Sequence, residues 1–184
     1  QKRAKYGVVG SHVNLTSHIE SYTVGGQVLI SESSAHELGD RLTTRRSFQV
    51  LPKGAREALT IYDVVGVRGV GDRDLLLPDL RAHKRTLSAG APVRFTVLEG
   101  KDASGEPLPG TLLSLDDRGN AEIAGAYVPE LLANIKLSLD GLDEHVYAKV
   151  QAGSPDHGIF SVRLAAIPPA LVAALAALPW QTSA

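Results

Sequence analysis

The sequence predicts an α+β protein made of two regions joined by a linker. In residues 1–66, short β-rich apolar runs alternate with helix-like segments, an order typical of a sheet covered by helices. In residues 81–184, short strand-like runs are separated by turn residues until a final helix, which is typical of a small barrel or sandwich. Residues 67–80 combine glycines with mixed charges and are predicted to form the linker.

Glycine and serine residues separate the predicted elements of the first region. A strand over residues 6–9 ends at Gly10, and a helix begins at Ser11, whose hydroxyl can cap it. The elements predicted after this helix are a strand over 27–31, a helix over 33–38, a strand over 47–51 and a strand over 58–65. Together these elements predict a single sheet with helices packed against it.

The second region contains six short segments that alternate between apolar and polar residues. They cover residues 92–98, 111–115, 121–123, 134–139, 146–151 and 159–164. A helix follows from Pro168-Pro169, and its apolar stripe comprises Leu171, Val172, Leu175 and Leu178. No basic face accompanies this stripe, so core packing explains it better than a membrane surface does.

Composition excludes several classes of function. The chain of 184 residues carries a formal net charge of -1, which argues against a protein that grips nucleic acid by bulk electrostatics. It contains no Cys, so disulfides and thiolate metal sites are absent, which fits a reducing compartment. The longest apolar run, residues 170–178, is far shorter than the roughly 20 residues of a membrane span. We expect a cytoplasmic protein.

A specific motif opens the first region. The motif compared is Tyr-x-x-x-Gly-x-x-Val-Asn-x-x-x-Arg. This chain matches it at Tyr6, Gly10, Val13 and Asn14 and has His18 at the final position. The match continues through residues 22–31, Lys53-Gly54 and 62–64. Residues 1–66 therefore resemble the C-terminal half of a class III adenylate/guanylate cyclase catalytic domain. The resemblance implies the C-terminal half of a cyclase-type α/β sandwich.

This resemblance implies roles for three residues. Asn14 stands where the family orients the ribose, and His18 stands where the family has an Arg that stabilises charge on the reacting phosphate. Lys53 is a candidate phosphate contact. Asn14 and His18 are four residues apart and share a helix face, a spacing also typical of a solvated face. A neutral imidazole lacks the guanidinium's fixed charge, and losing one such donor typically costs about 10²–10³ in rate.

The resemblance covers only half of the family's domain. The family's two metal-binding aspartates lie in the other half, so the sequence predicts a piece of a longer protein. Its parent would use Mg or Mn to convert ATP or GTP into a 3′,5′-cyclic nucleotide and pyrophosphate. The chain itself is expected to be inactive and to hold no metal. We expect it to self-associate through residues 1–66, where the sheet lacks its opening strands.

The second region resembles a PilZ domain in its layout. Arg81 and Arg85 form an Arg-x-x-x-Arg opening, and the later strands follow in the order of a six-stranded PilZ barrel with a terminal helix. The family's (Asp/Asn)-x-Ser-x-x-Gly turn reads here as Ser114-Leu115-Asp116-Asp117-Arg118-Gly119, with Ser and Asp exchanged. The resemblance implies a cyclic di-GMP site, whose candidate residues are Arg81, Arg85, Ser114, Asp116 and Gly119. Because Ser and Asp are exchanged and Asp117 adds a negative charge, we expect this binding to be weak or absent, and the alternative is a barrel that binds no ligand.

Two functions fit these resemblances. In the first, the chain belongs to a bacterial-type signalling protein in which a nucleotide cyclase is joined to a PilZ-like regulatory module. In the second, a degenerate cyclase-like domain is a scaffold, and the PilZ-like module binds cyclic di-GMP or a protein. Nucleoside triphosphate is the parent's expected substrate, and no nucleic acid is expected as a partner.

Overall fold

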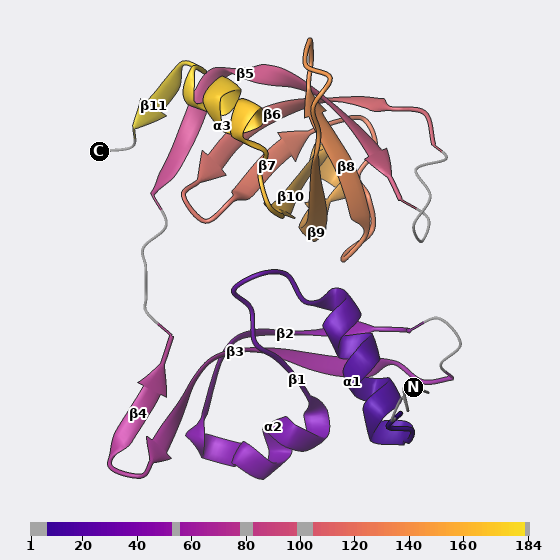
Figure 1. The fold of residues 1–184 in the computed structure, drawn as a ribbon, viewed down its shortest axis with the longest axis vertical. Coiled ribbons are helices and arrows are strands. Elements are labelled where there is room, and N and C mark those ends of the chain that lie inside the picture. The colour runs from indigo at the N-terminus through magenta and orange to yellow at the C-terminus, as the bar shows by residue number, and fades with distance from the viewer. Residues whose placement is uncertain (1–6, 53–55, 78–82, 99–104, 183–184) are drawn as a thin grey trace, which may run out of the picture. The chain divides into compact units, whose positions relative to one another are not determined.

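The computed structural model describes residues 7–52, 56–77, 83–98 and 105–182 (Figure 1). The chain forms two compact units, Gln1–Asp79 and Leu80–Ala184. Each unit builds its own sheet, and no strand of one pairs with a strand of the other among the described residues. No described helix combines the length and apolarity that crossing a membrane requires.

The first unit is an antiparallel sheet with two α-helices. Its elements are α1 (Ser11–Tyr22), β1 (Leu29–Ser31), α2 (Glu32–Leu38), a 3₁₀ turn (Gly39–Arg41), β2 (Leu42–Val50), β3 (Leu59–Val70) and β4 (Arg73–Leu76). The strand order is β1-β3-β2, and β4 also pairs with β3. Both helices lie where the sequence predicts them. The Ser31 hydroxyl accepts a hydrogen bond from the Ser34 backbone N–H and so caps α2.

Three predictions for the first unit are wrong. The Ser11 hydroxyl does not cap α1, because Gly10 is the N-cap residue and no side chain forms a capping hydrogen bond there. Residues 7–9 are not a strand, because no described strand pairs with them, and Val8 and Val9 are 79% and 91% exposed. Residues 67–76 are not linker, because the long strand β3 turns at Gly71 and returns as β4. Gly66 permits this return, since an added Cβ would lie 2.8 Å from the Leu75 carbonyl oxygen.

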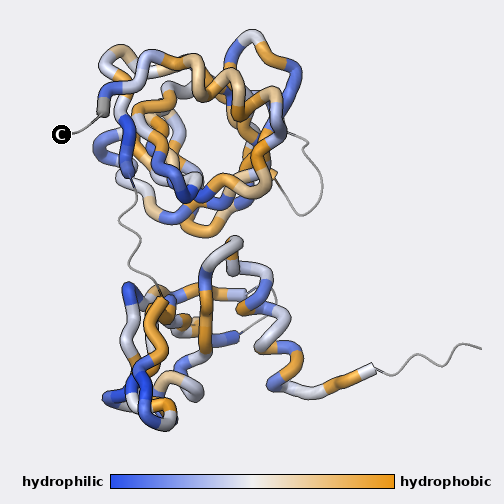
Figure 2. Tube along the Cα trace, turned by 60° about the vertical axis from the view of Figure 1, so that its left-hand side comes forward, coloured by the Kyte–Doolittle hydropathy of each residue, from blue (hydrophilic) through white to orange (hydrophobic). Residues whose placement is uncertain are grey.

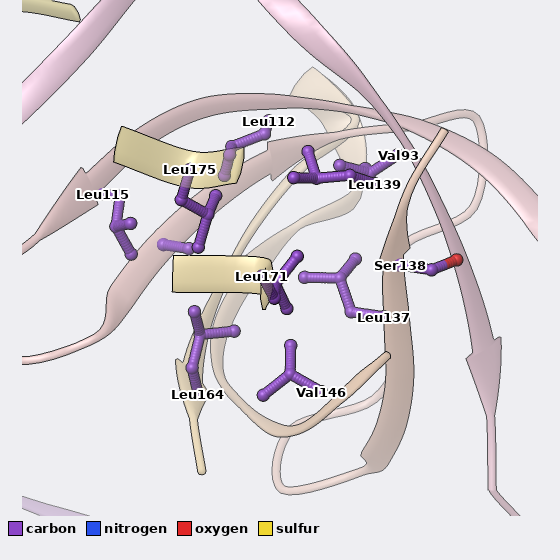
Figure 3. A pocket seen from close by; sticks show the side chains of 11 residues that line it. Val93, Leu112, Leu115, Leu137, Ser138, Leu139, Val146, Leu164, Leu171 and Leu175 are labelled. Atoms are coloured by element: carbon purple, nitrogen blue, oxygen red, sulfur yellow. The ribbon is translucent and has the colours of Figure 1, made fainter. Parts of the chain in front are cut away.

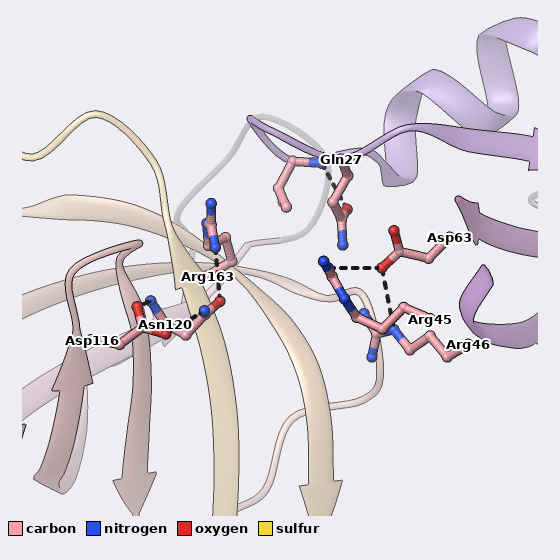
Figure 4. A network of polar contacts seen from close by, with 8 residues as sticks. Gln27, Arg45, Arg46, Asp63, Asp116, Asn120 and Arg163 are labelled. Atoms are coloured by element: carbon pink, nitrogen blue, oxygen red, sulfur yellow. Dashed lines mark hydrogen bonds and ion pairs between the residues drawn. The ribbon is translucent and has the colours of Figure 1, made fainter. Parts of the chain in front are cut away.

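The central strand β3 carries a buried charge. The Asp63 side chain is 2% exposed, and Arg45 and Arg46 of β2 approach its Oδ2 atom at 3.5 and 3.8 Å (Figure 4). The register of β2 against β3 shifts on both sides of Thr44, which brings two consecutive arginines to one carboxylate. An extended strand without this bulge would place Arg45 and Arg46 on opposite faces.

The second unit is a closed six-stranded antiparallel β-barrel. Its strands are β5 (Lys84–Val97), β6 (Leu108–Asp116), β7 (Asn120–Ala124), β8 (Asn134–Leu139), β9 (Val146–Ser154) and β10 (Ile159–Leu164), with a 3₁₀ turn (Pro155–His157) before β10. The order around the barrel is β5-β6-β7-β10-β9-β8, and the pairing of β8 with β5 closes it. Figure 2 shows this closed ring. The predicted α+β class with a small barrel and a terminal helix is confirmed.

The barrel encloses one apolar core. Phe95 and Phe160 meet edge to face at its centre, with ring centroids 5.1 Å apart. The helix α3 (Pro169–Ala176) covers one end and inserts Leu171 and Leu175 among the strand side chains (Figure 3). Val172, which the sequence places in the same stripe, is 49% exposed. The cavity beside α3 measures about 20 Å³, enough for about one water molecule.

A last strand, β11 (Trp180–Thr182), is absent from the sequence-based prediction. It pairs antiparallel with the start of β5, where Trp180 lies opposite Leu87 and Thr182 lies opposite Arg85. Three residues are too short a run to show the period-two pattern that identifies a strand. The pairing brings the end of the second unit beside its beginning.

Candidate functional site

Polar side chains line one side of the barrel sheet across four neighbouring strands, β5, β6, β7 and β10. Ser114 of β6 lies opposite Thr86 of β5 on one side and Glu122 of β7 on the other. Directly opposed residues project from the same face of a sheet. We call this surface the outer polar face, and its residues are Lys84, Thr86, Ser114, Asp116, Asn120, Glu122, Ser161 and Arg163.

Glu122 is the central acceptor of the outer polar face. Its Oε2 atom accepts hydrogen bonds from the Lys84 ammonium at 2.7 Å and from the Ser114 hydroxyl at 2.8 Å. The hydrogen bond from Lys84 is the largest cause that lowers the pKa of Glu122, and partial burial acts in the opposite direction. The Ser114 side chain, predicted to contact a ligand, therefore already has a partner within the barrel.

Asp116 organises the turn between β6 and β7. Its Oδ1 atom accepts the backbone N–H groups of Arg118 at 2.9 Å and Asn120 at 2.7 Å. Its Oδ2 atom accepts the Asn120 side-chain amide at 2.6 Å. Gly119 has a φ of +78°, a conformation that favours glycine, and donates its N–H to the Asp116 carbonyl at 3.1 Å. Asp116 and Gly119 therefore have structural roles in this turn.

The hydrogen-bond chain continues from Asp116 across the outer polar face (Figure 4). The Asn120 side-chain oxygen accepts a hydrogen bond from Arg163 Nη1 at 3.1 Å. Lys84 forms an ion pair with Glu122, and Arg163 donates a hydrogen bond to the neutral Asn120 amide, so both cations already have partners within the barrel. A charged ligand on this surface would have to displace contacts that already exist.

Arg85 lies on the opposite side of the sheet from Ser114. It is opposed by Leu115, which is buried, and it shares its face with buried Leu87 two residues along β5. Its guanidinium carbon lies 4.8 Å from the centroid of the Trp180 ring.

The N–H donors of the Arg85 guanidinium have no hydrogen-bond partner among the described residues. Among the described residues, none forms a hydrogen bond or ion pair with it. In the described part of the chain, the buried side-chain atoms that lack a hydrogen-bond partner are Thr43 Oγ1, Asp63 Oδ2 and Arg118 Nη2. The guanidinium nitrogens of Arg85 are not among these buried atoms, so they remain accessible to solvent. Stacking uses only the face of a guanidinium and leaves its donors free to bind an anion.

The structure brings together only some of the predicted ligand residues. Ser114, Asp116 and Gly119 lie in one hairpin, whereas Arg85 projects from the other face, and Arg81 lies outside the described residues. Sequence analysis missed Lys84, Glu122 and Trp180. Strand alternation offers a signal for Lys84, because a strand that begins at residue 84 puts residues 84 and 85 on opposite faces.

The first unit presents its predicted residues on α1. Asn14 is exposed and His18 is half-buried one turn later, while Ile19 anchors the helix as its buried residue. The Asn14 backbone N–H donates to the Gly10 carbonyl at 3.0 Å, which starts the helix directly after the glycine. Lys53 lies outside the described residues. In the described part of the chain, no three His, Asp or Glu side chains gather as a metal site would require.

We compared the chain with protein-family models and with curated proteins. The chain matches no protein-family model and no curated protein.

Proposed function

We propose that this chain is part of a signalling protein in which a cyclase-type half-domain is joined to a PilZ-like regulatory barrel. The observation that carries the proposal is the placement of Asn14 and His18 one turn apart on α1, directly after Gly10. Support also comes from the second unit, whose six strands close into a barrel with a C-terminal helix. Both features agree with the motifs that suggested the two families.

The proposed reaction is the cyclisation of a nucleoside triphosphate. The 3′-hydroxyl of the ribose gives up its proton to solvent, its oxygen forms a bond to the α-phosphorus, and the bond from that phosphorus to the bridging oxygen breaks so that pyrophosphate leaves. The Asn14 amide is suited to orient the ribose by donating and accepting hydrogen bonds. The His18 imidazole offers one donor near the developing charge but no fixed charge when neutral. Because the described residues form no metal site, the Mg or Mn of the parent reaction requires donors from outside them.

Assays of the parent protein with ATP and Mn²⁺ test this proposal. His18→Arg is expected to raise the rate about 10²-fold, because it restores a charged donor to the reacting phosphate. Asn14→Ala is expected to lower it, and Ser17→Ala, an exposed position on the same helix, provides the matched control. The chain alone is expected to form no product. Product from the chain alone would contradict the assignment of the first unit as an inactive half-domain. Equal rates for His18→Arg and the unchanged parent would show that His18 does not face the reacting phosphate. A parent protein that forms no product would favour the scaffold role.

We also propose that the barrel binds cyclic di-GMP through Arg85. The specific observation is that the Arg85 guanidinium keeps its hydrogen-bond donors accessible to solvent, whereas Lys84 and Arg163 already have partners. A hydrogen bond to a charged group contributes about 1.5–3 kcal/mol, so Arg85→Ala should weaken binding about 10- to 100-fold by calorimetry. Arg94→Ala is the control, because Arg94 lies on the same strand in an exposed ion pair with Asp140. Undiminished binding by Arg85→Ala would place the ligand elsewhere.

A further inference from the structure

We propose that Trp180 is a positioning residue that holds Arg85 ready to bind an anionic ligand. The inference rests on the proposed binding of cyclic di-GMP and adds a residue that neither sequence motif includes. It makes the C-terminal strand β11 part of the ligand site. The argument depends on how Trp180 is fixed, on the geometry of its stacking and on the donors that the stacking leaves free.

Trp180 is held by three independent contacts. Its indole N–H donates to the Leu175 carbonyl of α3 at 2.6 Å. Its backbone belongs to β11, which pairs with β5 opposite Leu87. Its side chain packs against the apolar core of the barrel. A ring fixed by a helix, a strand and the core provides a stable platform for whatever stacks upon it.

The Arg85 guanidinium lies over the Trp180 ring. The guanidinium carbon lies 4.8 Å from the ring centroid, within the roughly 6 Å at which a cation and an aromatic ring attract each other. An unrestrained arginine side chain samples many rotamers, and it loses this freedom when it binds a ligand. Stacking on Trp180 removes part of that freedom before any ligand arrives.

The donors that remain free fit a phosphodiester or a guanine edge. The N–H groups of a guanidinium lie in its plane, so a ring beneath the face does not block them. Their planar fork matches two phosphate oxygens, or the O6 and N7 acceptors of guanine. Cyclic di-GMP offers both groups. Arg85 therefore has the correct chemistry, and Trp180 reduces the entropy that binding must overcome.

Trp180 is the only Trp in the chain, so intrinsic fluorescence reports on this residue alone. The full chain is titrated with cyclic di-GMP while emission and calorimetric heat are recorded. We expect the emission to change along the same binding curve as the heat. Trp180→Leu should weaken binding about 5-fold, the equivalent of about 1 kcal/mol for an exposed cation–π contact. Trp180→Phe keeps an aromatic ring and should recover part of this loss, although it lacks the indole N–H.

Two further variants separate positioning from general stability. Arg85→Lys keeps the charge but loses the planar fork, so it should bind as weakly as Arg85→Ala. Arg94→Ala, on the same strand, should leave both the affinity and the emission change intact. Because Trp180→Leu can fail to fold, the affinity of a folded Trp180→Phe chain and the emission of the unchanged chain each provide a separate measurement.

The outcomes distinguish this inference from the proposal beneath it. Ligand binding with unchanged Trp180 emission and with full affinity in Trp180→Leu would overturn the role of Trp180 and leave cyclic di-GMP binding in place. Equal losses in Trp180→Phe and Trp180→Leu would show that an aromatic ring at this position does not by itself preserve affinity, and would overturn the cation–π contact as the source of the effect. The absence of calorimetric heat in the unchanged chain would overturn ligand binding itself, and the inference with it.

Discussion

The two units bury their apolar residues to very different degrees. The barrel closes its sheet and surrounds a single core cluster that extends from Leu87 to Leu175. In the described part of the first unit, the buried apolar residues are Ile19, Ala35, Ile61 and Val64. A closed sheet leaves no long unpaired edge, whereas the open sheet β1-β3-β2 leaves edges that can recruit another chain. The comparison leads us to expect that the barrel folds as a unit and that the first unit self-associates.

The largest expected effect is a loss of stability in the barrel, the better-packed unit. Phe160→Ala removes a ring that is 1% exposed and in contact with Phe95, and it should lower the free energy of unfolding of the barrel by about 3–5 kcal/mol. Urea unfolding measures the change. Ile159→Ala, at the partly exposed neighbouring position, is the control and should cost far less. A loss below about 1 kcal/mol for Phe160→Ala would show that the core is loosely packed.

A second prediction concerns the buried charge of the first unit. Combining Arg45→Ala with Arg46→Ala leaves the Asp63 carboxylate without compensation and should destabilise this unit by about 3 kcal/mol. Adding Asp63→Leu removes the charge and should restore most of the loss. Unfolding monitored by hydrogen exchange in β3 separates the two units. If the triple variant were no more stable than the double variant, Asp63 would not be the source of the loss.

A third prediction is that the chain associates through the open sheet of the first unit and not through the barrel. We expect the chain to self-associate through residues 1–66, where Val28 is 48% exposed beside a groove of about 310 Å³ that Leu77 also lines. Val28→Glu should weaken association about tenfold in light scattering at two concentrations. The matched control is Val172→Glu, at an apolar position of the barrel that is 49% exposed. A strictly monomeric chain, or an equal effect of Val172→Glu, would contradict this assignment.

The smallest expected effect is a pH dependence in the barrel. The pKa of Glu122 is lowered in the folded state, so its contribution to stability is present above the unfolded pKa and is lost as the pH falls through the folded pKa. Because the Glu122 side chain is 41% exposed, we expect a contribution of about 0.5 kcal/mol or less. Urea unfolding at pH 7 and pH 3 should show a smaller acid loss for Glu122→Gln. Glu130→Gln, at an exposed position, should retain the full loss.

Local patterns determined much of the fold. The strands β8 and β10 match their predicted bounds at both ends, because strict alternation of apolar and polar residues identifies a half-buried strand without knowledge of its partner. The helices α1 and α2 also follow from local start and stop signals, such as Gly39 after α2. The turn at residues 116–119 was likewise predicted from local residues, because Asp and Gly mark tight turns.

Only the tertiary structure decided which segments pair and which faces meet. Residues 7–9 have strand-like composition but no partner, whereas β11 is too short to recognise and forms because the start of β5 offers an open edge. The separation of Arg85 from Ser114 depends on the register of β5 against β6, where a one-residue shift would exchange the faces. The contact between Arg85 and Trp180 joins residues almost a hundred positions apart. A contact over this separation cannot be predicted from local sequence patterns, because it depends on how the whole barrel closes.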